Sequence, residues 1–243
     1  MQVVEIFASI QGEGKFIGTP STFIRLAGCN LRPPCKWCDT KYALDTKVGQ
    51  TLTPFKVASE GHDRGRIHVV LTGGEPLLHP HGELTELAGL LYHQGHIITV
   101  ETNATLMPPL SLKRYVALWS LSPKLPSAKV ETRVDWRNVV DYVARNMQAA
   151  TQVKFVISDE RDMLVAAAYA RVERAYHYIL QPEGYRAYDG TVQGTTRREA
   201  LEHYMDTYRR LVELAQGHFP IDQVSVQILP QLHVLVWGRQ RGV

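Results

Sequence analysis

Hydrophobic residues in this chain fall into short runs that are separated by amphipathic stretches and glycines. Six of these runs are rich in β-branched and aromatic residues and predict strands. They are residues 22–26, 67–71, 97–101, 117–121, 153–157 and 176–180. Between several of the runs, apolar residues recur with the spacing of a helix, over residues 83–93, 136–147 and 159–173. Crossovers long enough for helices predict parallel strands in right-handed βαβ units.

The two remaining parts of the pattern differ in clarity. Residues 195–216 predict an amphipathic helix, with Glu199 near its start and Arg209 and Arg210 near its end, followed by a strand-like run at 224–229. Residues 41–65 have several turn residues and weak periodicity, so we expect the first crossover to be shortened or irregular.

The predicted fold class is α/β. The strands are too few for a closed eight-stranded barrel, so we favour a partial, open TIM-like barrel of about six parallel strands with modified, shortened helical crossovers. An open doubly wound sheet is the alternative. The length of 243 residues predicts one domain, residues 1–243, with an N-terminal leading segment and a C-terminal helix, strand and tail.

Composition narrows the function classes only slightly. The formal net charge is +3, from 27 basic and 24 acidic residues, and no basic run is long enough to predict nucleic-acid binding. No apolar stretch is long enough to predict a membrane span. Residues 1–5 lack the features of a signal peptide, and clustered free cysteines then indicate a reducing cytoplasm.

The first candidate site is the set of the chain's 3 cysteines, Cys29, Cys35 and Cys38, which directly follows a predicted strand. An odd number of cysteines leaves one out of any disulfide scheme. A closed zinc site takes four ligands, whereas three thiolates on a four-iron cubane leave one iron open to a ligand. Trp37 is placed to shield a cluster edge. A structural zinc knuckle completed by one of the histidines remains the alternative.

The second candidate site is the turn Gly73-Gly74-Glu75-Pro76, again at a strand end. Paired glycines allow a ligand to approach the backbone, their amides can bind a carboxylate, and Glu75 can accept from an ammonium group. The alternative is an ordinary tight turn. His79 and His81 flank Pro80 just beyond it, and we do not expect them to be metal ligands.

A three-cysteine loop followed by a Gly-Gly-Glu-Pro turn resembles the radical S-adenosylmethionine (SAM) superfamily. The resemblance implies that the three cysteines bind a [4Fe–4S] cluster and that SAM chelates the open iron through its amino and carboxylate groups. It also implies that the glycine-rich turn holds the methionine end of SAM. Reductive cleavage of SAM would then give a 5′-deoxyadenosyl radical that removes a hydrogen atom from the substrate.

Further motifs narrow the resemblance. These are residues 10–14, Gly18, residues 23–29, 37–40, 101–102 and 122–124, and the tail from 229 to 238. Together they resemble the 7-carboxy-7-deazaguanine synthase family over nearly the whole chain. That family implies conversion of 6-carboxy-5,6,7,8-tetrahydropterin to 7-carboxy-7-deazaguanine with loss of ammonia, on the pathway to queuosine and other 7-deazapurines. It also implies catalytic use of SAM, a need for Mg²⁺, a homodimer, and an electron donor such as flavodoxin.

The resemblance assigns roles residue by residue. The expected substrate contacts are Ile10, Gln11, Gly12, Glu13, Arg25, Thr72, Glu101, Asn103, His233 and the C-terminal Val243. The expected SAM contacts are Trp37, Cys38, Asp39, Gly73, Gly74, Glu75, Ser122, Pro123, Lys124, Gln181 and Pro182. Thr40 is the expected Mg²⁺ ligand, since Mg²⁺ takes few protein ligands, and Asp39-Thr40 as a helix N-cap is the alternative. Among these, Arg25 lies in mid-strand, where a charge needs a ligand or partner.

One departure concerns the cysteine loop. Superfamily members commonly have three residues between the first two cysteines, and this chain has five, including Pro33 and Pro34. Prolines fix φ and lack an amide donor, so we expect a stiffer loop with fewer N–H groups for cluster sulfides. Two other functions stay open: a glycyl-radical activating enzyme, which leaves residues 11–14 and the His233 tail unexplained, and a zinc-stabilised binding module.

Overall fold

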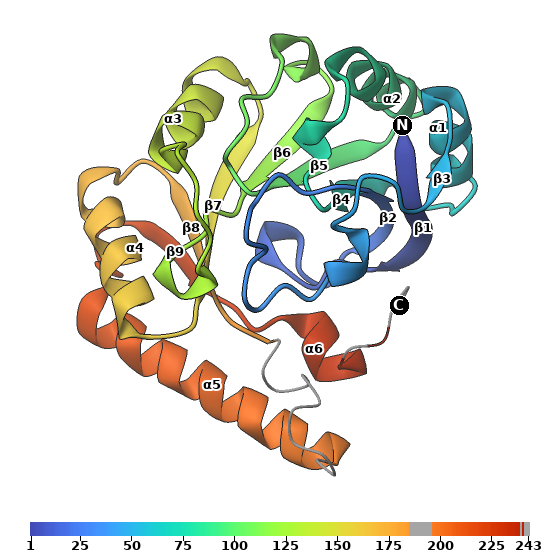
Figure 1. The fold of residues 1–243 in the computed structure, drawn as a ribbon. Coiled ribbons are helices and arrows are strands. Elements are labelled where there is room, and N and C mark those ends of the chain that lie inside the picture. Colours follow the sequence, from blue (N-terminus) through green and yellow to red (C-terminus); the bar gives the residue numbers. More distant parts are fainter. Residues whose placement is uncertain (185–195, 239, 241–243) are drawn as a thin grey trace.

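The structure is a computed structural model that describes residues 1–184, 196–238 and 240. Its strands form one curved nine-stranded sheet (Figure 1). The strand order is β3-β1-β2-β4-β5-β6-β7-β8-β9. From β2 onward neighbouring strands are parallel, which makes seven parallel strands among the described residues. Helices α1 to α4 lie around the outside of the curve, so the α/β partial barrel predicted from sequence is confirmed.

Strands and helices alternate along most of the chain. The strands are β1 (Gln2–Ile10), β2 (Pro20–Leu26), β3 (Gln50–Thr51), β4 (His68–Gly73), β5 (Ile97–Thr102), β6 (Val116–Leu121), β7 (Ala150–Ile157), β8 (His177–Pro182) and β9 (Ser225–Ile228). The α-helices are α1 (Pro54–His62), α2 (His81–His93), α3 (Trp136–Asn146), α4 (Glu160–Val172), α5 (Arg197–His218) and α6 (Leu232–Trp237). Between β5 and β6 there is only a 3-10 turn, Leu110–Leu112, so that crossover is shortened as expected.

The beginning of the sheet was not predicted. β1 pairs antiparallel with β2, and the two-residue β3 pairs antiparallel with β1. The region 41–65 also contains α1, which begins where the Thr53 side chain accepts a hydrogen bond from the Lys56 amide, with Pro54 in the first turn. Both features are ordinary helix-start signals. The first crossover therefore contains a regular helix, and its irregular part lies before residue 53.

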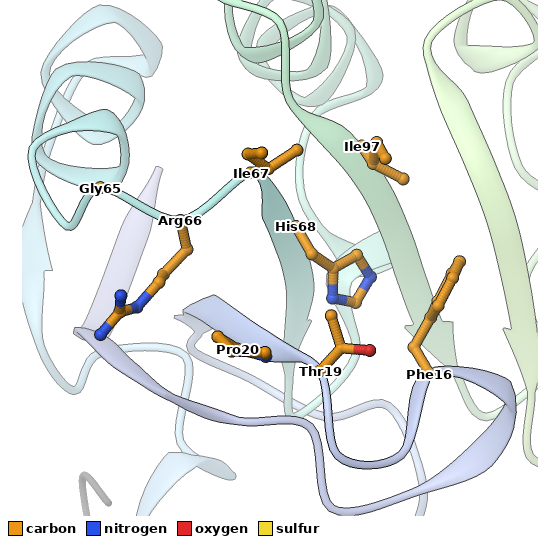
Figure 2. Close-up of a pocket in the computed structure, with 8 residues that line it drawn as sticks. All are labelled: Phe16, Thr19, Pro20, Gly65, Arg66, Ile67, His68 and Ile97. Atoms are coloured by element: carbon orange, nitrogen blue, oxygen red, sulfur yellow. The ribbon is translucent and has the colours of Figure 1, made fainter.

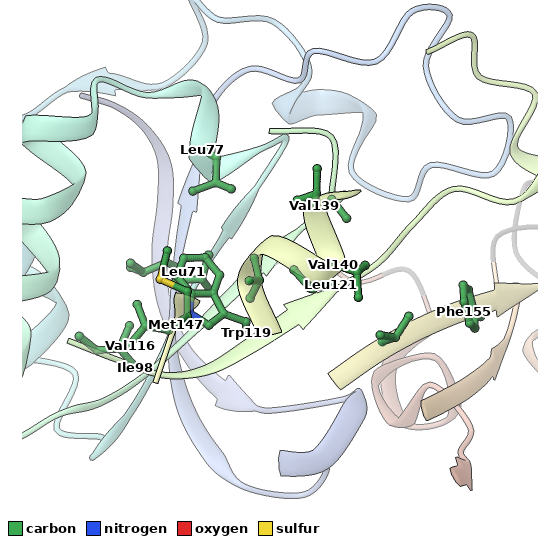
Figure 3. Packing of buried hydrophobic residues seen from close by; sticks show 14 of the residues in the cluster. Leu71, Leu77, Ile98, Val116, Trp119, Leu121, Val139, Val140, Met147 and Phe155 are labelled. Carbon is green, nitrogen blue, oxygen red and sulfur yellow. The ribbon is translucent and has the colours of Figure 1, made fainter. Parts of the chain in front are cut away.

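Alternate residues of each strand face opposite sides of the sheet. The side toward the helices is apolar and fully buried, as Leu71, Ile98, Trp119, Leu121 and Phe155 show (Figure 3). Burying a side chain of this size contributes roughly 1.5–3 kcal/mol. This helix-facing layer therefore holds the curved sheet in shape, and the opposite faces of the same strands enclose the interior.

The connection between β1 and β2 fills part of this interior. We call residues 11–19 the floor loop. β1 ends beside the start of β2, where Ile10 pairs with Pro20. From there the floor loop turns inward, because the Lys15 amide donates to Gln152 Oε1 on β7 at 2.8 Å. Gly14 has a φ of +68°, and a Cβ on it would lie 2.3 Å from Gln152 Nε2. A side chain at this position would thus be strained by the positive φ and would displace the Gln152 amide from the loop.

The chain after β9 returns to the floor loop across the open side of the barrel. We call residues 229–238 the closing segment. The Leu232 amide donates to the Gly12 carbonyl at 2.9 Å. A Cβ on Gly12 would lie 2.3 Å from His233 Nδ1, so a larger residue here would displace the His233 ring. The closing segment therefore joins the last strand to the first loop and covers the gap that the sheet leaves.

Candidate active site

The three cysteines lie in a loop at the carboxyl ends of the parallel strands. Cys29 follows β2 after two residues, and the Gly28 and Cys29 amides donate to the carbonyls of Ala43 and Leu44. The Lys36 amide donates to the Ala128 carbonyl after β6. The loop thus reaches from β2 across to the exit of β6. This is the edge at which α/β folds bind ligands.

The cysteines share one apolar cluster, which also contains Leu31 and Ala128. All three thiols are free, with Cys29 and Cys35 buried. Burial raises the pKa of the Cys35 thiol, although the Lys124 ammonium lowers it, and burial together with Asp39 raises the pKa of Cys38 to about 11. Cluster binding must therefore deprotonate Cys35 and Cys38 against this effect of burial, because the thiolate is the metal ligand.

The donor set of this loop fits an iron–sulfur cluster better than a single metal ion. Among the described residues, no group of three or more His, Cys, Asp or Glu side chains is arranged to hold one metal ion. The loop offers three free thiols, which matches the three protein ligands of a four-iron cluster that leaves one iron open. Arg32 folds back on the loop and donates to the Cys29 and Leu31 carbonyls at 2.9 and 2.8 Å. These bonds give the five-residue gap a defined shape.

The Gly-Gly-Glu-Pro turn packs directly on the start of the cysteine loop. The Gly74 amide donates to the Leu26 carbonyl at 3.1 Å, and the Glu75 amide donates to the Gly28 carbonyl at 2.7 Å. A Cβ on Gly74 would lie 1.9 Å from the Gly28 oxygen, so the glycine is needed for backbone contact. Of the two glycine amides expected to bind a carboxylate, that of Gly74 is already taken by the Leu26 carbonyl, while the role of the Gly73 amide stays a prediction.

Glu75 is likewise engaged within the protein. Its side chain is fully buried and accepts hydrogen bonds from the Leu77 and Asn103 amides at 3.0 and 2.7 Å. Burial raises the pKa of Glu75, against these hydrogen bonds, which lower it. Glu75 thus fastens the turn to the end of β5. His79 stabilises the same turn by donating to the Ala27 carbonyl at 2.9 Å. Contact of Gly73, Gly74 and Glu75 with SAM stays a prediction.

Polar side chains line the interior below this loop. Gln11 Nε2 donates to Glu101 Oε1 at 3.1 Å, and Thr72 Oγ1 donates to Glu101 Oε2 at 3.0 Å. The structure therefore brings three of the predicted substrate residues together, from the floor loop, β4 and β5. A carboxylate that is held by two donors on strands and loop keeps its remaining lone pairs toward the interior.

Arg25 lies on the interior face of β2, and Thr72 is its neighbour in register on β4. Its Nε donates to Glu5 Oε1 at 2.7 Å, and its guanidinium carbon lies 5.8 Å from the centre of the Phe7 ring. Glu5 is also bound by the Tyr42 hydroxyl at 2.8 Å. The structure gives no hydrogen bond from the two Nη atoms within its described part. Arg25 is thus held through its Nε atom, on the same interior face as Thr72.

The ends of β5 and β6 carry the next predicted residues. Asn103 Nδ2 donates to Asn30 Oδ1 in the cysteine loop at 2.9 Å. Lys124 Nζ donates to Ser122 Oγ at 3.0 Å and lies 5.5 Å from the centre of the Trp37 ring. Pro123 lies between them in the same turn. The residues at the ends of β5 and β6 therefore contact the cysteine loop on two sides. Their positions directly after strands in the sequence predict this.

The remaining predicted residues are spread around the rim. At the end of β8, Gln181 is buried and its Nε2 donates to the Pro230 carbonyl at 3.0 Å, with Pro182 next to it. His233 lies against Gly12 in the closing segment. The Thr40 hydroxyl donates to Asp39 Oδ1 at 2.8 Å, beside Cys38. Ile10 is the last residue of β1, and Val243 lies outside the described residues.

Sequence analysis missed Lys154, which lies in mid-strand on β7 and contacts Glu13 in the interior. Gln231 was missed as well, and its Nε2 donates to Glu13 Oε1 at 2.6 Å. The signal for Lys154 was available, since a charge within the apolar run 153–157 needs a partner, as Arg25 does. Gln231 lies within the tail motif 229–238, but that motif gave it no role of its own.

A separate cavity of about 350 Å³ lies at the opposite, amino end of the strands (Figure 2). Its lining includes Phe16, Thr19, His68 and Ile97. His68 faces it, but Ser21 Oγ and Thr99 Oγ1 occupy both ring nitrogens at 2.7 and 2.8 Å. The cavity shares no residue with the cysteine loop or with the predicted substrate residues.

Comparisons with known proteins agree with this arrangement. The sequence profile of the Radical SAM superfamily matches residues 23–164. A 7-carboxy-7-deazaguanine synthase of Pyrobaculum aerophilum is 33% identical over 244 aligned residues, which cover 100% of this chain and 97% of that protein. The chain belongs to the 7-carboxy-7-deazaguanine synthase family. A synthase of Halobacterium salinarum is 34% identical over 98% of this chain and 91% of its own length.

Family membership extends to the fold. The crystal structure of QueE from Escherichia coli superimposes with a TM-score of 0.61 and 23% identity, over 93% of this chain and 92% of that one. This likeness supports the curved parallel sheet, and the Radical SAM profile match includes the cysteine loop at its carboxyl end. Among the described helices, none combines the length and apolar character that crossing a membrane requires.

Proposed function

We propose that this chain converts 6-carboxy-5,6,7,8-tetrahydropterin to 7-carboxy-7-deazaguanine with release of ammonia. One observation carries the proposal: a loop with three free thiols lies over a barrel interior lined by polar side chains, in a chain of this family. Such an interior suits a small substrate with many hydrogen-bonding atoms, because buried polar groups need partners.

Cys29, Cys35 and Cys38 would hold a [4Fe–4S] cluster with one iron left for SAM. The cluster, when bound, supplies the electron for the reductive cleavage of SAM. The chain's own part is to bind, orient and exclude water. The SAM contacts proposed are Trp37, Cys38, Asp39, Gly73, Gly74, Glu75, Ser122, Pro123, Lys124, Gln181 and Pro182. Mg²⁺ would lie beside Thr40, with water and the substrate carboxylate as further ligands.

The substrate would lie between the cysteine loop and the floor loop. The two Nη groups of Arg25 would donate hydrogen bonds to the carboxylate of the substrate. Glu13, Gln11 and Glu101 would accept or donate along the edge of the pterin ring. The closing segment favours a small substrate over the glycyl loop of a protein partner, because Leu232 and Gln231 already bind the floor loop across the open side. We also infer a homodimer and an electron donor such as flavodoxin, both from family resemblance.

The test is turnover by protein purified and reconstituted without oxygen, with the carboxytetrahydropterin, SAM and a reductant. We expect 7-carboxy-7-deazaguanine to form while the amount of SAM stays constant. Cys38→Ser is the matched control, because it removes one cluster ligand and no substrate contact. Colourless protein with one zinc would overturn the cluster assignment. Brown protein that cleaves SAM and leaves the pterin unchanged would overturn the substrate.

A further inference from the structure

The barrel interior contains a buried ion pair that the proposed reaction does not yet use. The side chain of Lys154 is 8% exposed, that of Glu13 is 15% exposed, and their charged groups are in contact. A buried pair of this kind stabilises a fold little, because desolvation offsets the attraction and apolar residues of similar volume often do as well. Its presence in this position therefore needs a reason other than stability.

The pair lies at a junction between three parts of the chain. Lys154 comes from β7, Glu13 from the floor loop, and Gln231 of the closing segment donates to the second oxygen of Glu13 at 2.6 Å. Both oxygens of Glu13 thus have a fixed donor. The carboxylate cannot rotate without breaking one of these bonds, so its free lone pairs keep one direction in the interior.

We infer that Lys154 is a positioning residue for the substrate, because it holds Glu13 in place as a hydrogen-bond acceptor for the amino edge of the pterin ring. This inference rests on the proposed function. An ionised carboxylate only accepts, whereas a protonated one presents an O–H group, which would oppose the N–H donors of the ring. Lys154 thereby determines whether Glu13 can accept hydrogen bonds from this edge of the substrate.

The charges around the pair support this role. Burial alone would raise the pKa of Glu13, but Lys154 and His233 lower it to about 2. Burial opposes the charge of Lys154, while Glu13, Glu101 and Asp39 raise its pKa. If the ammonium is removed, burial remains and only His233 and Gln231 still lower the pKa of Glu13, so that pKa rises. Glu13 would then be protonated at low pH and would regain its charge as the pH rises.

The experiment compares Lys154→Met with the native protein and with Lys154→Arg, which keeps the charge. For Lys154→Met we expect the KM for the carboxytetrahydropterin to rise at least about tenfold with a smaller change in kcat, the size expected for loss of a hydrogen bond to a charged group. The native KM should be flat from roughly pH 6 to pH 8, whereas the KM of Lys154→Met should fall as the pH rises. Lys154→Arg should restore a flat profile.

Two further variants keep the test decisive. Glu13→Gln combined with Lys154→Met leaves no unpaired charge, so it should fold, keep a raised KM and show no pH dependence. Lys154→Gln retains a donor but no charge and should show the pH dependence even if Lys154→Met does not fold. Iron content and SAM cleavage should match the native protein in every variant.

The outcomes separate this inference from the proposed function. Native protein without turnover of the pterin overturns the proposed function and the role of Lys154 with it. Native turnover together with a Lys154→Met or Lys154→Gln variant of native KM at every pH overturns the role of Lys154 alone. A raised KM with a flat profile would show that Lys154 acts only through packing, and this also contradicts the inference.

Discussion

The two faces of the same strands do different work. On β4, Leu71 faces the helices and is fully buried among apolar side chains, while its neighbour Thr72 faces the interior and donates to Glu101. On β7, Phe155 and Lys154 show the same contrast. Because the side-chain period of a strand is two, one apolar layer and one polar layer arise from adjacent residues. Stability is concentrated on the outer face, and the binding groups are concentrated on the inner face.

The difference is one of energy as well as of chemistry. Removing buried methyl groups from a packed layer costs both the transfer free energy and the cavity that is left. A hydrogen bond within the interior contributes only about 1 kcal/mol net, because the same groups bind water in the unfolded chain. Uncharged hydrogen-bonding residues of the inner face can therefore be exchanged at small cost in stability, and their effect should be seen in binding. The buried pair of Lys154 and Glu13 is the exception, because removing one partner leaves an unpaired charge.

The largest effect is expected on the outer face. Leu71→Ala should lower the free energy of unfolding by roughly 2–5 kcal/mol, since the side chain has no exposed surface and its neighbours cannot fill the space. Thr72→Val, one residue away, should cost only about 1 kcal/mol, for the bond to Glu101. Urea unfolding of both variants measures this difference. Equal losses would mean that the two faces share the stabilising work.

An intermediate effect is expected for Arg25 on the inner face. Arg25→Ala should weaken binding of the carboxytetrahydropterin by about 1.5–3 kcal/mol, roughly ten- to a hundredfold, since a charged hydrogen-bond donor is lost. Calorimetric titration of the reconstituted protein measures the affinity. Iron content and SAM binding should stay unchanged, because Arg25 contacts Glu5, Phe7 and Tyr42 rather than the cysteine loop.

Arg25→Lys is the control for Arg25→Ala. It keeps the charge beside Glu5 but loses the planar fork, so binding should recover only partly. Arg25→Met with Glu5→Gln removes both charges and tests whether an unpaired Glu5 disturbs the fold. If iron content falls in all three variants, Arg25 holds the fold and not the substrate.

The two faces were predictable from the sequence to different degrees. Apolar runs mark the outer face directly, and six of the nine described strands were predicted in this way, as was the strand-like run at β9. β1 was missed because most of its residues are only half-buried and Glu5 interrupts its apolar pattern. The helix α1 was missed because turn residues around it obscured the start signal at Thr53 and Pro54.

The inner face was predictable in position but not in pairing. Residues that follow strands gather at the carboxyl edge, so Cys29, Gly73, Glu101 and Ser122 were expected to lie near one another. The partnership of Glu13 with Lys154 spans 141 positions of the chain, and nothing local in the sequence encodes it. The same holds for the hydrogen bond from the Gly74 amide to the Leu26 carbonyl, which uses an amide that was expected to bind a ligand.

The smallest effect is expected for the pH dependence of stability, which should also belong to the inner face. His68 lies between Ser21 and Thr99, and burial lowers its pKa to about 4. The folded state therefore binds this proton less readily than the unfolded chain, whose His titrates near pH 6.5. Its stability contribution is full above about pH 6.5 and is lost as the pH falls toward 4.

Between about pH 7 and pH 5.5 the native protein should lose roughly 1 kcal/mol more than His68→Gln, in paired urea titrations. Parallel curves for the two proteins would show that His68 is protonated as easily in the fold as outside it.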